Sequence, residues 1–131
     1  MSGSPIQPDG WMKPRGYSNG MRARGEVLAI AGQIGWNARG ELVSEEFAAQ
    51  FEQALSNVID IVRAGGGKPE DLVSLTIFIT DRGEYLSSLP AMGEGYRRLM
   101  GRHYPSMACI IIAGLLEPRA KVEIQGLAVL P

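Results

Sequence analysis

Glu123 is the residue whose type and position most clearly suggest chemistry. In "AKVEIQGLAV", alternation places Val122 and Ile124 on one face of a strand and Glu123 on the other, in a run where a carboxylate is unusual. On a solvated face, Glu123 would be an ordinary strand residue paired with Lys121. At a subunit interface its pKa would rise, and it could act as a base that activates water. The pattern alone leaves both interpretations open.

Cys109 and His103 form a second candidate group. They lie six residues apart, which suggests a cysteine–histidine nucleophile pair, but a predicted turn separates them. The alternatives are a surface histidine near a helix end and a cysteine that packs as a small apolar side chain. Each is the only residue of its type in the sequence, so an internal disulfide, a multi-cysteine zinc site and a two-histidine metal site are excluded. We expect no metal.

Signatures of phosphate and cofactor binding are missing. "AGGGKPED" superficially resembles a phosphate loop, but the P-loop requires Gly-x4-Gly-Lys-Ser/Thr, and here a proline follows Lys68. The segment is better explained as a helix end. The sequence also has no Gly-x-Gly-x-x-Gly dinucleotide fingerprint, so we expect no cofactor.

The charge balance argues against nucleic acid as a partner. Thirteen basic and fourteen acidic residues give a net charge of -1, whereas nucleic-acid affinity depends on clustered Lys and Arg. The single cysteine suits a reducing cytoplasm. The first twenty residues lack the apolar run of a secretory signal, and no segment approaches the about 20 apolar residues of a membrane span.

The elements that must position these residues follow from periodicity. A β-forming run predicts a strand over 26–33, and apolar residues at helical spacing predict a helix that Ser44 caps and "GGGKP" ends. "DLVSLTIFITD" alternates as a strand with one buried face, and helical spacing returns from Tyr85 to Leu99. Two further strands are expected over 107–113 and 120–130.

This order predicts an α+β fold, in which two helices pack on one face of a mixed sheet. The 131 residues suit a single domain, 1–131, with residues 1–16 as an extended arm held by a neighbouring segment. The run from Cys109 to Ile112 is apolar on both strand faces, although a sheet covered on one side should alternate. We therefore expect another subunit to cover the second face, and a homo-oligomer.

Several segments together resemble the Rid family (RidA/YjgF, also called L-PSP), small trimeric imine and enamine deaminases. "GYSNG" is similar to the family's opening Gly-Pro-Tyr-Ser, and "IAGQIG" to its Ser-Gly-Gln-Ile strand. The family's helix, glycine turn and strand are matched by "ALSNVIDIVRAGGGKPEDLVSLTIFITD". The aromatic end of its second helix is matched by "GYRRLM". "YPSMACIIIAGLLEPRAKVEIQGLAV" is similar to its signature block. The resemblance covers the chain from about Gly16 onward.

The resemblance implies a RidA/chorismate-mutase-like fold, a homotrimer around a central barrel of sheets, and one site at each subunit interface. Transferred by position, it implies substrate-binding roles for Tyr17, Ala31, Gly32 and Cys109, and makes Glu123 the residue that positions water. Cys109 would contribute its backbone amide. No cofactor is implied.

Met107 is the main departure from the family, because characterised deaminases have an arginine there that binds the substrate carboxylate. Losing such a contact costs on the order of a few kcal/mol. Ala31 replaces a hydroxyl, Trp36 adds an aromatic ring, and the turn "GLLEPRAKVE" is one residue longer than usual. Arg15 and Arg119 are candidates to restore the cation, or are ordinary solvated charges.

Three functions follow as hypotheses. The first is hydrolysis of an imine or enamine with non-standard specificity, in which Glu123 activates water and Gly32 and Cys109 bind developing charge. The second is a non-catalytic protein that binds a small metabolite in the same cleft. The third, endoribonuclease, comes from the alternative family name and is disfavoured by the near-neutral charge and the single histidine.

Overall fold

Helices and strands follow one another in nearly the predicted order. The structure, a computed structural model, describes residues 3–131. Its elements are β1 (Ser4–Ile6), β2 (Gly20–Arg22), β3 (Glu26–Gln33), α1 (Phe47–Ala64), the 3-10 turn η1 (Pro69–Asp71), β4 (Leu72–Ile79), α2 (Arg82–Ser87), α3 (Leu89–Met100), β5 (Ser106–Ile111) and β6 (Val122–Leu130).

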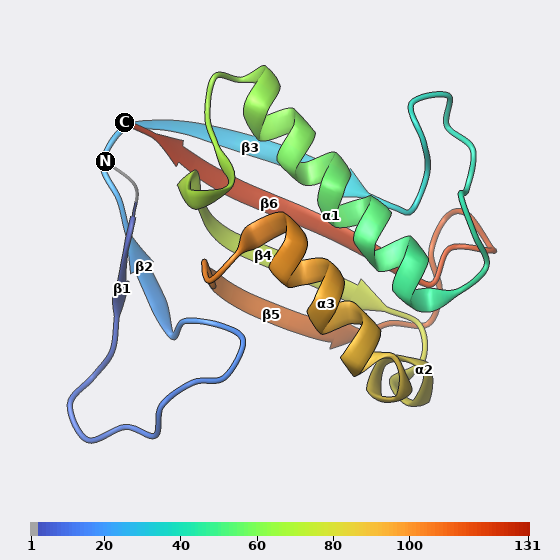
Figure 1. Ribbon diagram of the computed structural model, residues 1–131, viewed down its shortest axis with the longest axis horizontal. Helices are drawn as coiled ribbons and strands as arrows, with labels where there is room; N and C mark the ends of the chain where they lie inside the picture. Colours follow the sequence, from blue (N-terminus) through green and yellow to red (C-terminus); the bar gives the residue numbers. More distant parts are fainter. Residues whose placement is uncertain (1–2) are drawn as a thin grey trace.

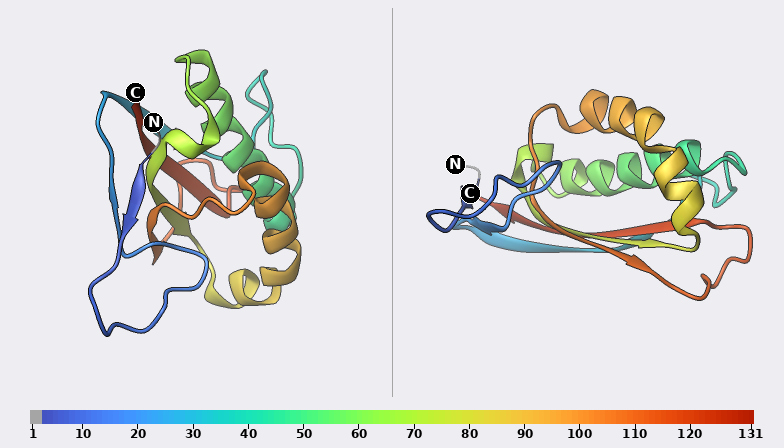
Figure 2. Two further views of the ribbon diagram at one scale, coloured as in Figure 1. Left: turned by 60° about the vertical axis from the view of Figure 1, so that its left-hand side comes forward. Right: turned by 90° about the horizontal axis from the view of Figure 1, so that it is seen from below.

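The main sheet has four strands in the order β3-β6-β4-β5. β6 pairs antiparallel with both β3 and β4, whereas β5 pairs parallel with β4 and forms one edge. All of the helices lie on one face of this sheet, and no element of the described chain lies on the other (Figure 1; Figure 2, right). The predicted α+β fold with a mixed sheet covered on one face is therefore confirmed.

The core lies between this face and α1. The apolar stripe of α1 is buried, and Leu55, Val58 and Val62 have no exposed surface. Opposite them, Leu75 on β4 and Ile124 on β6 are almost completely buried, as their alternation predicts. Each such side chain contributes roughly 1.5–3 kcal/mol of hydrophobic stabilisation. Burial of this face therefore fixes which residues of each strand point away from the helices.

The outer face of the sheet exposes apolar side chains. Val27 on β3, Leu127 on β6 and Ile110 on β5 are 64%, 37% and 43% exposed, and strand alternation and register place all three on the side without helices. Such a surface agrees with the expectation that another copy of the chain covers it, which stays a prediction.

The helical region after β4 differs from the single helix predicted between Tyr85 and Leu99. It consists of two helices, α2 and α3, which meet at Ser88. Pro90 lies in the first turn of α3, where its missing N–H has no intrahelical partner to lose. Inside one continuous helix, the same proline would break the hydrogen-bond ladder.

The start of α1 also differs from the prediction. Ser44 does not cap the helix, because α1 begins at Phe47 and Glu46 occupies the N-cap position. The Ser44 hydroxyl instead accepts a hydrogen bond from the backbone N–H of Glu46 at 2.9 Å, in the turn that precedes the helix. The predicted helix end is confirmed, since Gly66 adopts a φ of 94° just beyond α1.

The N-terminal arm has secondary structure that the sequence did not reveal. β1 lies within the predicted arm and pairs antiparallel with β2 of the same chain, forming a two-stranded ribbon beside the main sheet (Figure 1). Each strand has only three residues, too few to produce a periodic pattern. The segment that holds this part of the arm is therefore Gly20–Arg22.

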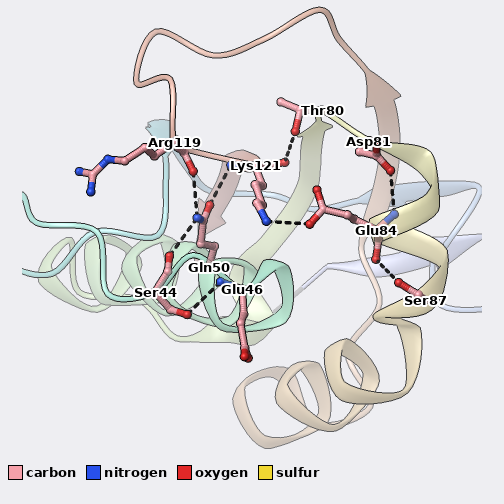
Figure 3. Close-up of polar contacts among 9 residues, drawn as sticks. All are labelled: Ser44, Glu46, Gln50, Thr80, Asp81, Glu84, Ser87, Arg119 and Lys121. Atoms are coloured by element: carbon pink, nitrogen blue, oxygen red, sulfur yellow. Dashed lines mark hydrogen bonds and ion pairs between the residues drawn. The ribbon is translucent and has the colours of Figure 1, made fainter.

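Gln50 joins α1 to the segment that leads into β6 (Figure 3). Its side chain is completely buried. The amide nitrogen donates to the carbonyl oxygens of Ser44 at 3.0 Å and Arg119 at 3.1 Å, and the amide oxygen accepts from the N–H of Lys121 at 2.8 Å. One buried side chain thus fixes the chain two residues before Glu123.

Gln50→Leu should lower the free energy of unfolding by about 1–3 kcal/mol, because it leaves buried backbone groups without partners. Urea denaturation at a fixed protein concentration measures the change. Gln53→Leu is the matched control: Gln53 is a half-buried residue of the same helix that bonds only to Asn57. An equal loss in both variants would contradict a special role for Gln50.

Candidate active site

Tyr17, Met107 and Cys109 line one pocket on the helix-covered side of the sheet. The pocket has a volume of about 480 Å³ and lies between β5, α2, α3 and the segment before β2. Met107 is half-buried and packs against the core, and Tyr17 is 40% exposed. Five of the lining residues are aromatic: Tyr17, Phe51, Tyr85, Tyr96 and Tyr104. Three of the six residues assigned to the site are therefore brought together in an aromatic pocket.

The inner wall of the pocket is held in place by Tyr96. Its hydroxyl donates to the carbonyl oxygen of His103 at 2.6 Å, and its ring stacks on Tyr104 with centroids 5.1 Å apart. Burial, with a smaller contribution from Tyr104, raises the pKa of Tyr96. This hydroxyl therefore stays neutral and is committed to a structural hydrogen bond.

Cys109 contributes its thiol to the pocket and its amide to the open edge of β5. Burial raises the pKa of the thiol above its ordinary value of 9.0, and a hydrogen bond from the Tyr85 hydroxyl offsets part of this rise. The amide of Ile112 donates to Ile79 on β4, so alternation directs the amide of Cys109 away from β4. A ligand at this edge would meet a free backbone donor.

The cysteine–histidine pair considered from the sequence does not form. The Nε2 atom of His103 lies 2.7 Å from the carbonyl oxygen of Leu72, which can only accept, so this nitrogen is a donor. His103 does not line the pocket that contains Cys109. The position of His103 just beyond the end of α3 agrees with the alternative, a histidine near a helix end.

Glu123, Gly32 and Ala31 lie elsewhere, at the outer face of the sheet. Glu123 is half-buried and pairs in register with Phe78 of β4. A Cβ atom added to Gly32 would stand only 2.6 Å from Oε2 of Glu123, so the carboxylate lies directly over the glycine backbone. Ala31 is exposed in the irregular stretch between Ile30 and Gln33.

Lys121 is not the partner of Glu123. Its ammonium group binds the carboxylate of Glu84 on α2 at 2.7 Å (Figure 3). Among residues 3–131, the carboxylate of Glu123 has no hydrogen-bond or ion-pair partner. The pairing with Lys121 considered from the sequence is therefore wrong, and Glu123 remains available to water or to a ligand.

The sheet separates the two groups of site residues within one chain. The side chains of Met107 and Cys109 point toward the helices, because they pair in register with buried Leu75 and Ile77, whereas Glu123 lies on the opposite face. Of the two edge strands, β3 and β5, only β5 lines the pocket. A single site that uses both groups therefore requires an approach around this edge or a second copy of the chain.

The structure distinguishes the two arginines considered as replacements for the missing one. Arg15 lines the pocket beside Met107. Arg119 does not: its side chain contacts Glu117 at 3.4 Å, and its carbonyl oxygen is bound by Gln50. Trp36 also lies outside the pocket lining.

Sequence reasoning missed Arg97, which lines the pocket together with Arg15. The signal that could have found it is helical spacing, since Arg97 lies one turn after Gly93 and beside Tyr96 on α3. Exposed helical arginines are common, however, so spacing alone does not single this one out.

No group of three or more His, Cys, Asp or Glu residues within 3–131 could hold a metal ion. In the same range, no helix is long and apolar enough to cross a membrane.

Solved structures show which class of protein has this fold. A Rid-family protein of unknown function, YyfB from Yersinia pestis, superposes with a TM-score of 0.87 at 30% identity, covering 99% of this chain and 100% of that one. TdcF from Escherichia coli, with bound serine, gives a TM-score of 0.69 at 29% identity over 98% and 99% of the two chains. The class is that of the YjgF/RidA fold.

Sequence comparison identifies the family. The family described as Endoribonuclease L-PSP matches residues 12–130, and the chain belongs to it. A 2-iminobutanoate/2-iminopropanoate deaminase from Escherichia coli K12 is 32% identical over 105 residues, which are 80% of each chain. The human protein of the same name is 29% identical over 104 residues, 79% of this chain and 72% of that one.

Alkylation of Cys109 by iodoacetamide should have its half-maximal rate above pH 9.0, because burial disfavours the thiolate. Tyr85→Phe should move this midpoint further upward, since it removes the hydrogen bond that stabilises the thiolate. The pH profile of the alkylation rate measures both. Tyr104→Phe serves as the control, because it removes another hydroxyl from the same pocket, and a fall of the midpoint in Tyr85→Phe would contradict the assignment.

Proposed function

We propose that the protein hydrolyses the carbon–nitrogen double bond of an imine, or of an enamine after its tautomerisation. The observation that supports this most directly is the unpaired carboxylate of Glu123, which lies over the backbone of Gly32 on the face that also exposes Val27, Ile110 and Leu127. Relatives with about 30% identity are named 2-iminobutanoate/2-iminopropanoate deaminase, which supports the same reaction.

In this mechanism, Glu123 accepts a proton from a water molecule whose oxygen attacks the imine carbon. The backbone amides near Gly32 and Cys109 bind charge that develops as the bond forms, and Tyr17 covers the ligand. Glu123 passes this proton to the nitrogen, which gives a neutral carbinolamine, and then moves the hydroxyl proton to the amine as the carbon–nitrogen bond breaks and ammonia leaves. The balance is one imine and one water giving one carbonyl compound and one ammonia.

We further propose that the site is assembled between subunits of a homotrimer. Glu123 and Gly32 lie on the face that exposes Val27, Ile110 and Leu127. Covering this face with another copy would bury apolar surface and exclude water from the carboxylate. The single cysteine supports a reducing cytoplasm as the location of this trimer.

Met107 supports a specificity different from that of the named relatives. Their substrates, 2-iminobutanoate and 2-iminopropanoate, are small and have a carboxylate, and TdcF was solved with serine, which also has one. Met107 offers the pocket no donor for such a group. The same substitution is also consistent with the alternative function, a non-catalytic protein that binds a metabolite in this cleft.

Endoribonuclease activity, after which the family is named, has less support. The net charge is -1, and the only histidine is bound to the carbonyl of Leu72. Acid–base cleavage of RNA would require other groups.

Glu123→Gln should reduce imine hydrolysis by roughly 10²- to 10⁴-fold, because it keeps the shape of the side chain and removes the base. The assay measures ammonia released from an imine that an amino-acid oxidase generates in situ. Glu26→Gln, the same change at an exposed residue of β3, should leave the rate unchanged. Wild-type activity in Glu123→Gln would sink this mechanism, and saturable metabolite binding without turnover by the wild type would favour the non-catalytic alternative.

Met107→Arg should increase kcat/KM for 2-iminopropanoate by roughly 10-fold or more, since an arginine can pair with its carboxylate. The kcat/KM for an uncharged imine should not increase. Met107→Leu keeps the volume without adding a donor and should match the wild type on both substrates. The proposed change of specificity fails if the wild type already turns over 2-iminopropanoate as efficiently as Met107→Arg does.

A further inference from the structure

The pocket beside β5 combines apolar walls with an unbalanced positive charge. Arg15 and Arg97 are the only residues of its lining with a charged side chain, and the lining contains no aspartate or glutamate. Neither arginine has a carboxylate partner among residues 3–131. By contrast, Arg98, the next residue on α3, turns away and binds Glu52 at 2.8 Å.

The guanidinium of Arg97 has a defined place on the pocket wall. A Cβ atom at Gly93, one turn earlier on α3, would lie 3.3 Å from Nη1 of Arg97. The guanidinium therefore lies along the bare backbone of α3, and both residues line the pocket. A larger side chain at position 93 would displace it.

No other group in the pocket neutralises this charge. The thiol of Cys109 and the hydroxyls of Tyr85 and Tyr96 have pKa values raised by burial, so they remain neutral near pH 7. Met107 and the stacked pair Tyr96 and Tyr104 line the same pocket and contribute apolar surface to it. An occupant must therefore have an anionic end and an apolar end.

We infer that Arg97, assisted by Arg15, binds the carboxylate of a ligand whose aromatic side chain lies against Met107 and Tyr104. Arg97 then provides the cation that position 107 lacks, from a different element of the fold. The inference deepens the proposed function, on which it rests, by naming the substrate class as 2-imino acids with an aromatic side chain.

The arrangement also orients the ligand. Arg97 and Arg15 are exposed, whereas Met107 is half-buried against the core, so the carboxylate lies at the mouth and the ring inside. Cys109 of β5 also lines the pocket, so the open edge of β5 is the part of the pocket that a carboxylate from the outer face of another copy could approach.

Calorimetric titration with 3-phenylpropanoate tests the inference without relying on turnover. The neutral isostere 3-phenylpropanamide and the small anion propanoate separate the contributions of charge and ring. Wild type should bind 3-phenylpropanoate more tightly than either. Arg97→Met should weaken binding of 3-phenylpropanoate roughly 10- to 100-fold and abolish the preference over the amide, because a charge-assisted pair is lost.

Arg98→Met is the matched control, since it removes an equal charge one residue away from a solvent-exposed ion pair outside the pocket. It should leave the affinity for 3-phenylpropanoate unchanged, and thermal unfolding checks that both variants are folded. An equal loss of affinity for 3-phenylpropanoate in Arg97→Met and Arg98→Met would overturn the assignment of Arg97. Equal affinity for propanoate and 3-phenylpropanoate would overturn the aromatic class.

Failure of this inference is distinguishable from failure of the proposed function. Arg97-dependent binding in a protein that hydrolyses no imine would support the inference and refute the deaminase. If Arg97→Met leaves both imine hydrolysis and the affinity for 3-phenylpropanoate unchanged, the deaminase is supported and this inference is refuted.

Discussion

Register in the four-stranded sheet is the constraint on which the other features depend. Side chains alternate along each strand, so shifting β6 by one residue would bring Glu123 into the core and expose Ile124. The burial of Val122 and Ile124 against α1 prevents this shift. The same pairing places Gly32 of β3 under the carboxylate, where any side chain would force the carboxylate to move from this position. The energy that stabilises the fold is therefore also what positions the candidate base.

One-sided coverage of the sheet gives the molecule two chemically different surfaces. The helix-covered side contains an aromatic pocket with two cations, and the outer side displays a carboxylate together with exposed apolar side chains. Neither surface alone has the parts of a hydrolytic site, since one lacks a base and the other lacks an anchor for an anionic substrate. Joining them around the edge of β5 is what the proposed assembly accomplishes.

Periodicity was sufficient to predict the longer strands and the first helix. The alternation of β4, the helical stripe of α1 and the bounds of β3 all agree with the structure. The break at Ser88 was not predictable in this way, because Tyr85, Leu89 and Met92 keep helical spacing across it. For the site, alternation placed Glu123 on the correct face. Its contact with Gly32 depends on pairing between distant strands, and the proposed role of Arg97 depends on a pocket that segments distant in sequence enclose.

The connection between β5 and β6 is fixed at both ends and free in the middle. The amide of Ile112 is held by Ile79, and Gln50 holds Arg119 and Lys121, whereas Leu116 between them is fully exposed. Residues added to or removed from this stretch change only the length of a surface loop. Changes of length in this loop would therefore leave the position of β6, which the hydrogen bonds of Gln50 fix, unaltered.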